Sequence, residues 1–190
     1  MVKLTNVMSN SFYYFFSATS QVLAAILALF GVFVIFKIQS TKTNIIGIGE
    51  SLLERLKRIN SKQYASFDLP DNFTFRQFER TIENAIMRND IKKLITTIDI
   101  ITNDDYKYYG RNIHKLDEFL ENLITRTIFW SIITAIVIIV CLSIIPFGQI
   151  ILNNFFILYS LYGIVIISLI FIFYNLISIL KESLENIKLE

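Results

Sequence analysis

The longest uncharged stretch of the chain lies near its C-terminal end, with no Asp, Glu, Lys or Arg between Arg126 and Lys181. Two apolar runs, Ile128 to Ile145 and Phe155 to Leu180, flank a short segment from Pro146 to Asn154. Each run is long enough, as a helix, to cross the roughly 30 Å of bilayer hydrocarbon. Backbone polar groups in lipid must be satisfied within the segment. The pattern therefore predicts a helical transmembrane hairpin.

A further uncharged stretch covers residues 4 to 36, and its apolar run from Phe12 to Phe36 predicts a first span. The alternative is a cleaved signal peptide, with Lys3 as its positive region and Ala24 or Ala28 near the cleavage site. The apolar run continues past these alanines, and aromatic residues crowd its start. Both features are untypical of a signal peptide, so we expect a retained span and three spans in total.

Between the first span and the hairpin, residues 39 to 127 hold 14 of the 18 Lys and Arg residues and 13 of the 16 Asp and Glu residues. Apolar residues recur there every three or four positions, which predicts amphipathic helices rather than strands. The first of these helices should continue from the first span, and the last should run unbroken into the second. The four apolar stripes consist of Ile45, Ile48, Leu52, Leu56 and Ile59; Phe75, Phe78, Ile82 and Ile86; Ile91, Leu94, Ile95, Ile98 and Ile101; and Ile113, Leu116, Leu120 and Leu123.

Helix boundaries within this segment have recognisable signals. Pro70 disfavours helix at the residue before it, and Asp71 is a good N-cap. Thr74 and Gln77 have the spacing of a capping box. A short turn is expected at Arg88-Asn-Asp90, and the next helix should end near Thr102-Asn-Asp-Asp105.

Together these elements predict an all-α membrane protein with three transmembrane helices, one N-terminal and two in a C-terminal hairpin, and a small cytoplasmic helical bundle between them. The expected domains are an N-terminal segment with the first span (1–40), a cytoplasmic helical domain (41–127), the hairpin (128–180) and a cytoplasmic tail (181–190). A soluble part this small buries only a modest core, which makes oligomerisation plausible.

The orientation follows from the basic residues near the ends of the spans, because Lys and Arg favour the cytoplasmic side. One side carries almost all of them, whereas the other has only Lys3 and an uncharged hairpin loop. We expect a multi-pass protein of the cell membrane with its N-terminus outside. The basic residues that support this orientation are Lys37, Lys42, Arg55, Lys57, Arg58, Arg111, Lys115, Arg126, Lys181 and Lys188.

The most specific pattern inside a span is a stripe of small residues in the first one, which would let another helix approach closely. Gln21, the one strongly polar side chain deep in this span, lies beside it, and such groups usually face a partner or a water-filled cavity. The stripe could pack within the chain or form a seam between copies. This candidate seam consists of Ser17, Ser20, Gln21, Ala24, Ala28 and Gly31.

The remaining chemistry is sparse. The net charge of +2 gives no basic patch for nucleic acid, and a single cysteine, Cys141, allows neither an intrachain disulfide nor a cysteine-based zinc site. The spans contain no ionisable residue of the kind that proton relays and ion-coupled transporters need. His114 is expected to form local ion pairs with Asp117 and Glu118. Ile46-Gly-Ile-Gly49 lacks the context of a phosphate loop and suggests a flexible joint.

No catalytic residue, metal site or cofactor is therefore expected. We expect a non-enzymatic integral membrane protein, embedded in the lipid bilayer and homo-oligomeric, that acts as a channel-like protein or membrane effector controlled by its cytoplasmic helices. The alternative hypothesis is a membrane-tethered adaptor or sensor, whose helical faces from Phe75 to Ile101 would bind a cytosolic protein.

Overall fold

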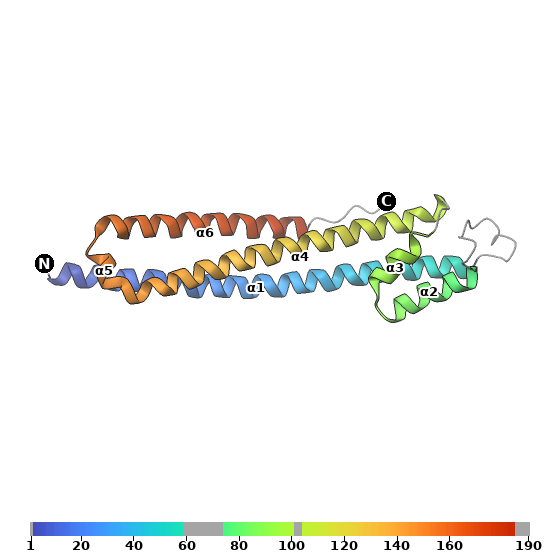
Figure 1. Cartoon of the computed structure of the whole chain (residues 1–190), viewed down its shortest axis with the longest axis horizontal. Helices are drawn as coiled ribbons and strands as arrows, with labels where there is room; N and C mark the ends of the chain where they lie inside the picture. Colours follow the sequence, from blue (N-terminus) through green and yellow to red (C-terminus); the bar gives the residue numbers. More distant parts are fainter. Residues whose placement is uncertain (1, 59–73, 101–103, 185–190) are drawn as a thin grey trace. The chain divides into compact units, whose positions relative to one another are not determined.

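The computed structural model describes residues 2–58, 74–100 and 104–184, and Figure 1 shows their arrangement. These residues form helices joined by short turns and contain no strand. Three of the helices, α1, α4 and α6, are long and apolar enough to cross a membrane. The elements are α1 (Val2–Lys57), α2 (Phe75–Met87), α3 (Ile91–Ile98), α4 (Asp104–Ile144), the 3₁₀ turn η2 (Ile145–Phe147), α5 (Gly148–Leu152) and α6 (Phe155–Leu184).

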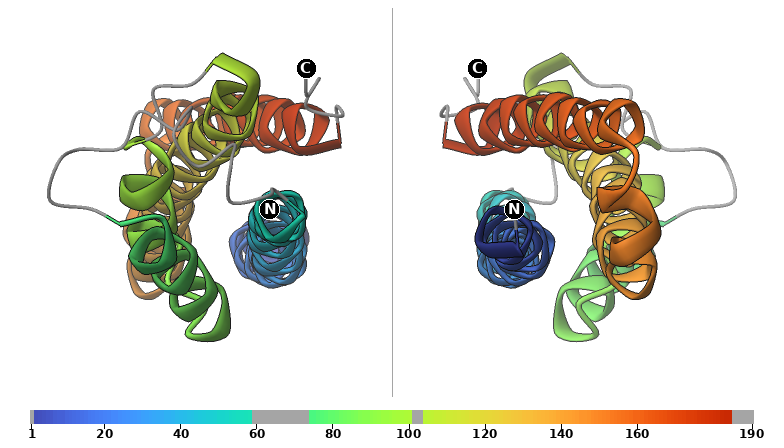
Figure 2. Two further views of the ribbon diagram at one scale, coloured as in Figure 1. Left: turned by 90° about the vertical axis from the view of Figure 1, so that its right-hand side faces the viewer. Right: turned by 90° about the vertical axis from the view of Figure 1, so that its left-hand side faces the viewer.

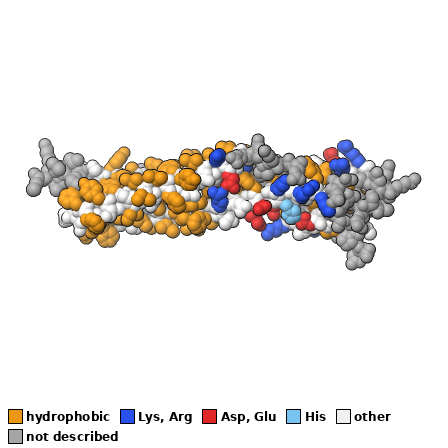
Figure 3. Space-filling model, turned by 90° about the horizontal axis from the view of Figure 1, so that it is seen from above, with side chains coloured by type: hydrophobic (Ala, Val, Ile, Leu, Met, Phe, Trp, Pro, Cys, Tyr) orange, Lys and Arg blue, Asp and Glu red, His pale blue; other side chains and the backbone are white. Residues whose placement is uncertain are grey.

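The chain divides into two compact units. The first comprises Met1–Ile35 and Leu123–Glu185, and the second comprises Phe36–Asn122 and Asn186–Glu190. Helices α1 and α4 contribute to both units. Hydrophobic side chains dominate the face of the first unit that Figure 3 shows, whereas charged side chains gather over the second.

α1 is a single helix of 56 residues, which confirms that the amphipathic stretch continues from the first span. The expected flexible joint at Ile46-Gly-Ile-Gly49 is wrong, because both glycines lie inside this unbroken helix. A Cβ atom on Gly49 would lie 3.0 Å from Cδ2 of Leu94 in α3. Gly49 therefore allows close helix packing, which is a second use of glycine besides backbone freedom.

The start of α2 confirms the expected capping box. The side-chain oxygen of Thr74 accepts a hydrogen bond from the backbone N–H of Gln77, and the Gln77 side chain accepts one from the backbone N–H of Thr74. This arrangement satisfies two N–H groups that a helix end leaves unpaired. Pro70 and Asp71 lie outside the described residues.

The expected turn between α2 and α3 is also confirmed. Asn89 has a φ of 54°, a left-handed conformation that asparagine tolerates better than most residues. Asp90 then caps α3, because its carboxylate accepts a hydrogen bond from the backbone N–H of Lys93 at 3.1 Å. α3 ends at Ile98, short of the expected stop, and Thr102 and Asn103 lie outside the described residues.

The second unit has its own core, to which α1, α2, α3 and α4 all contribute, and α2 packs against α3 (Figure 2). The apolar stripes predicted from the sequence contribute to it except at Leu123, which belongs to the first unit. Ile59 and Ile101 of those stripes lie outside the described residues. The faces of these helices therefore cover one another within the chain. The buried core residues are Ile45, Leu52, Leu53, Leu56, Phe78, Ile82, Ala85, Leu94, Ile95, Ile98, Ile113, Leu116 and Leu120.

The first unit contains the hairpin. α4 runs unbroken from Asp104 to Ile144, as expected, and the chain then turns through Pro146 in η2 and through the short helix α5. The side chain of Asn154 caps α6 by accepting a hydrogen bond from the backbone N–H of Ile157 at 3.3 Å. One buried cluster of this unit consists of Phe12, Phe16, Cys141, Ile151, Leu158 and Val165.

Candidate helix-packing seam

One face of α1 packs into the core of the first unit. Phe12, Leu23 and Val34 are buried at intervals of eleven residues, and Phe16 and Phe30 are buried between them. An interval of eleven residues corresponds to about 3.67 residues per turn, close to that of a straight helix. The buried face therefore follows a nearly straight line along α1 and consists mainly of large side chains.

Aromatic rings hold the N-terminal part of α1 against α6. The ring of Tyr162 contacts Phe12, Phe15 and Phe16, with centroid distances of 6.4, 4.6 and 5.6 Å. Tyr13 packs against Gly148 of α5, where an added Cβ atom would lie 2.7 Å from the tyrosine ring. The sequence gives no periodic signal for these contacts, because aromatic residues occupy five successive positions at the start of the run.

The predicted seam lies mostly beside this buried face. Of the predicted residues only Ser20 is buried, and its hydroxyl donates a hydrogen bond to the carbonyl of Phe16 at 2.9 Å. Gln21, Ala24 and Ala28 are exposed. Successive residues point about 100° apart around a helix, so Ala24 faces away from the buried Leu23.

The two ends of the seam have intermediate exposure. Ser17 and Gly31 are both partly buried, and a Cβ atom on Gly31 would meet nothing within 4 Å. The small residues from Gln21 to Gly31 thus leave space beside α1 that no described part of the chain fills. The side chain of Gln21 makes no hydrogen bond to any described residue, whereas a polar group in hydrocarbon is costly without a partner.

A groove between α1 and α6, which sequence reasoning missed, lies on the other side of the buried face. It has two adjoining sections of about 460 and 410 Å³, which share Phe173 as a lining residue. The first section is lined by Ser11, Tyr14, Phe15, Ala18, Thr19, Val22 and Leu169, and the second by Ile26, Leu29, Phe30, Phe33, Leu176, Ile177 and Leu180.

Polar side chains join the two helices of the hairpin at the end away from α5. Arg126 of α4 forms an ion pair with Glu182 of α6 and donates a hydrogen bond to the Ser178 hydroxyl at 3.5 Å. The hydroxyls of Thr127 and Ser183, in the same helices, are buried without a hydrogen-bond partner. The sequence signal for the ion pair was available, since Arg126 borders the longest uncharged stretch at one end and Glu182 follows Lys181 at the other.

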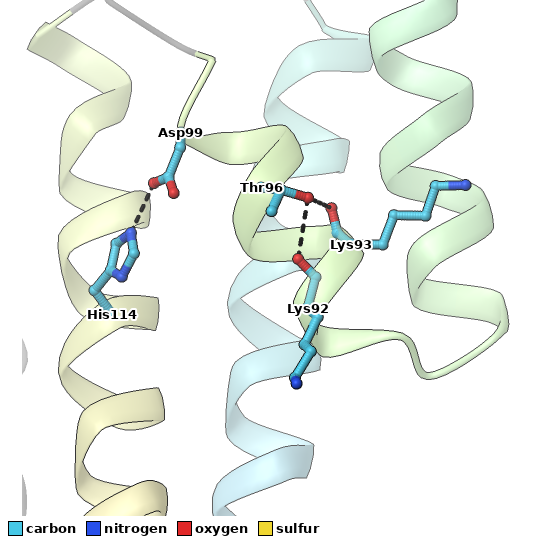
Figure 4. Close-up of polar contacts among 5 residues, drawn as sticks. All are labelled: Lys92, Lys93, Thr96, Asp99 and His114. Carbon is cyan, nitrogen blue, oxygen red and sulfur yellow. Dashed lines mark hydrogen bonds and ion pairs between the residues drawn. The ribbon is translucent and has the colours of Figure 1, made fainter.

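His114, the one histidine, does not pair with its neighbours in α4. Its Nε2 atom lies 2.7 Å from a carboxylate oxygen of Asp99, the residue that follows α3, as Figure 4 shows. The expected local pairing with Asp117 and Glu118 is therefore replaced by a contact between helices. Among the described residues no group of three or more His, Cys, Asp or Glu side chains could hold a metal ion.

Comparisons with protein-family models, with curated proteins and with solved structures found no match for this chain.

Proposed function

We propose that the protein is a non-enzymatic, homo-oligomeric membrane protein, channel-like or a membrane effector, whose copies meet through the seam of α1. The observation that carries this proposal is that Gln21, Ala24 and Ala28 are exposed. They lie beside the face of α1 that is buried within the chain. Small residues let helix backbones approach closely, and polar side chains join helices by hydrogen bonds across the contact. A second copy would supply a hydrogen-bond partner for the Gln21 side chain, which has none among the described residues.

The same proposal gives the protein an orientation and a means of control. The basic residues near the span ends support an N-terminus outside the cell and a cytoplasmic second unit acting as a helical bundle. α1 and α4 each continue from the first unit into the second without a break. A rotation or shift of these helices in the second unit would therefore pass to the spans along continuous helix and not through a linker.

The adaptor hypothesis has less support. It assigned partner binding to the helical faces from Phe75 to Ile101, but Phe78, Ile82 and Leu94 are fully buried in the core of the second unit. A cytosolic partner would need a different surface.

The test of the proposed function combines particle mass with membrane flux. The full chain in nanodiscs should have the mass of a discrete oligomer by light scattering, after subtraction of the lipid contribution. Gln21→Leu should change ion or dye flux through vesicles at an unchanged protein level. Gln149→Leu is the matched control, because it makes the same chemical change at an exposed position in α5. A monomeric mass, or equal flux from both variants and the parent protein, would contradict the proposal.

A further inference from the structure

We infer that the turn between α2 and α3 rests on anionic headgroups at the membrane surface, where Met87 enters the interface and the basic side chains around it bind lipid phosphates. This inference rests on the proposed function in two respects, that α1 crosses the membrane and that the second unit is cytoplasmic. It does not depend on the contact between copies. All the residues that carry it belong to the part of the second unit from Phe36 to Asn122.

α2 runs back along α1 toward the end of the first span. Lys57, the last residue of α1, forms an ion pair with Glu83 of α2 at 3.1 Å. Further along the chain, Ile86 and Asn89 line a cleft of about 300 Å³ together with residues of α1. The lining residues from α1 are Gln39, Lys42, Thr43 and Ile46. The partners of α2 in α1 therefore move from Lys57 toward the first span as the turn is approached.

The turn lies at the level of the lipid headgroups. The uncharged stretch of α1 ends at Phe36, and the cleft residues Gln39 and Lys42 follow it. At a rise of about 1.5 Å per residue they lie about 5–9 Å beyond the uncharged stretch. The headgroup region of each leaflet is about 5–8 Å thick, from a hydrocarbon core of about 30 Å within a bilayer of about 40–45 Å. Asn89 lines the same cleft, so the turn is placed beside the headgroups.

Met87 is the exposed apolar side chain at this turn. It is 71% exposed, whereas Ala85 is fully buried in the core of the second unit. Among the described residues of this unit, the other large hydrophobic side chains that are exposed are Phe36, at the end of the first span, and Tyr108 of α4. Lipid at the interface would cover the Met87 side chain without displacing any contact of the core.

The side chains around Met87 carry an excess of positive charge. The one acidic residue among positions 87 to 93 is Asp90, which caps α3. Lys42 of the adjoining cleft adds a further positive charge. The exposed basic residues of the turn and the start of α3 are Arg88, Lys92 and Lys93, and Figure 4 shows the two lysines at the end of α3 that follows the turn.

Charge and depth together identify the partner. Cytoplasmic leaflets carry anionic lipids, and each basic residue near such a surface favours binding about fivefold. An acidic protein would also attract these side chains. The headgroup layer, however, already lies beside the turn, so an anionic lipid surface fits both the charge and the position of Met87.

Fluorescence quenching by labelled lipid tests the depth of the turn. In a Cys141→Ala background, a fluorophore is attached at Met87→Cys, and the full chain is placed in nanodiscs of phosphatidylcholine with or without phosphatidylglycerol. A nitroxide on the lipid headgroup should quench this label strongly in the discs that contain phosphatidylglycerol. Arg80→Cys is the matched control, because Arg80 is exposed and lies on nearly the same side of α2, about 10 Å further from the turn. Its label should be quenched much less.

Charge variants test the choice of an anionic lipid. With the label at Met87→Cys, Arg88→Gln combined with Lys92→Gln should lower the ratio of bound to released turn about 25-fold in discs that contain phosphatidylglycerol. The same changes should have little effect in phosphatidylcholine alone. Arg76→Gln combined with Arg80→Gln removes an equal charge from exposed positions earlier in α2 and should leave the quenching unchanged.

The remaining outcomes separate the two proposals. Equal quenching of the labels at Met87→Cys and Arg80→Cys would overturn the inference, because the turn would then not lie at the membrane surface. Quenching at Met87→Cys that does not depend on phosphatidylglycerol would also overturn it, because the basic residues would then have no part in the contact. Light scattering on the same discs tests the homo-oligomer separately, since a monomeric mass would contradict the oligomer and leave the membrane contact in place.

Discussion

The two units use apolar residues differently. In the second unit each helix has an apolar stripe and a polar face, and the stripes are buried against one another. In the first unit the helices are apolar on almost every side, so large hydrophobic residues are found both inside and outside. In α6, for example, Val165 is 4% exposed and the preceding Ile164 is 61% exposed. Hydrophobic periodicity therefore identifies the packing face in the charged unit and fails to do so in the apolar one.

The largest expected effect lies in the core of the second unit. Phe78→Ala removes a fully buried ring from α2, and such a truncation should cost about 3–5 kcal/mol of unfolding free energy. Hydrogen exchange of the α2 amides in the full chain measures this loss as reduced protection. Met87→Ala, in the same helix at 71% exposure, is the control and should change little. Equal effects from the two variants would contradict the assignment of this core.

In the first unit, Gly148 marks a close contact between α5 and α1. Gly148→Ala should destabilise the packing of α5 against α1 by about 1–3 kcal/mol, because the added Cβ would collide with the ring of Tyr13. Gly163→Ala in α6 meets open space and should be neutral or slightly stabilising. Unfolding in mixed micelles by increasing SDS compares the two variants.

A double variant isolates this collision. Removing the ring with Tyr13→Ala should make the further change Gly148→Ala nearly neutral, so that the two effects are strongly non-additive. Additive effects would show that the cost of Gly148→Ala arises from the turn itself and not from contact with α1.

Two glycines of α1 in the second unit, Gly47 and Gly49, should differ less in the effect of an alanine substitution on stability than Gly148 and Gly163 do. Gly47→Ala adds a Cβ in open space and should stabilise the helix by about 0.5–1 kcal/mol. Gly49→Ala gains the same helix propensity but brings its Cβ to 3.0 Å from the buried Leu94 side chain, so it should be less stable than Gly47→Ala. Thermal unfolding followed by circular dichroism ranks the two. A flexible joint at these glycines would instead predict equal stabilisation.

Much of the fold followed from local sequence signals. The uncharged stretches indicated three helices that could cross a membrane, and Thr74 with Gln77 marked the start of α2 at the correct residues. The candidate seam was predicted from the spacing of small residues in the sequence. That spacing did not indicate that Gln21, Ala24 and Ala28 are exposed. Whether Ala24 is exposed or buried depends on which side of α1 the large aromatic residues occupy. That side is set by long-range contacts such as those of Phe12 and Phe16 with Tyr162.

The groove and the contact of His114 with Asp99 were beyond sequence reasoning for the same reason. Thr19 and Phe173 line one groove although they are far apart in the chain, and neither residue belongs to a periodic pattern. His114 had acidic neighbours one turn away in its own helix, yet it contacts Asp99, whose place beside α4 depends on the packing of α3. The spacing of residues in the sequence indicates which partners a side chain can reach within its own helix. It does not indicate which residues of another helix pack beside that side chain.

The smallest expected effects come from two ion pairs of similar exposure, one in each unit. The side chains of Arg126 and Glu182 are 39% and 47% exposed, and those of Lys57 and Glu83 are 48% and 42% exposed at a separation of 3.1 Å. Pairs of this exposure contribute about 0.2–1 kcal/mol in water. If Arg126 and Glu182 lie at the edge of the bilayer, as their position beside the uncharged stretch indicates, a lower local dielectric should make their coupling the stronger of the two.

Double-mutant cycles to alanine measure both couplings in the full chain, at low and at high salt. The coupling of Arg126 with Glu182 should be the larger and should fall less with salt, because ions screen charges near hydrocarbon less effectively than charges in open water. Lys57 with Glu83 serves as the internal reference, since its helices belong to the charged unit. Equal couplings with equal salt dependence would mean that both pairs are surrounded by water, and the membrane boundary would then have to lie further along α4 and α6 toward α5.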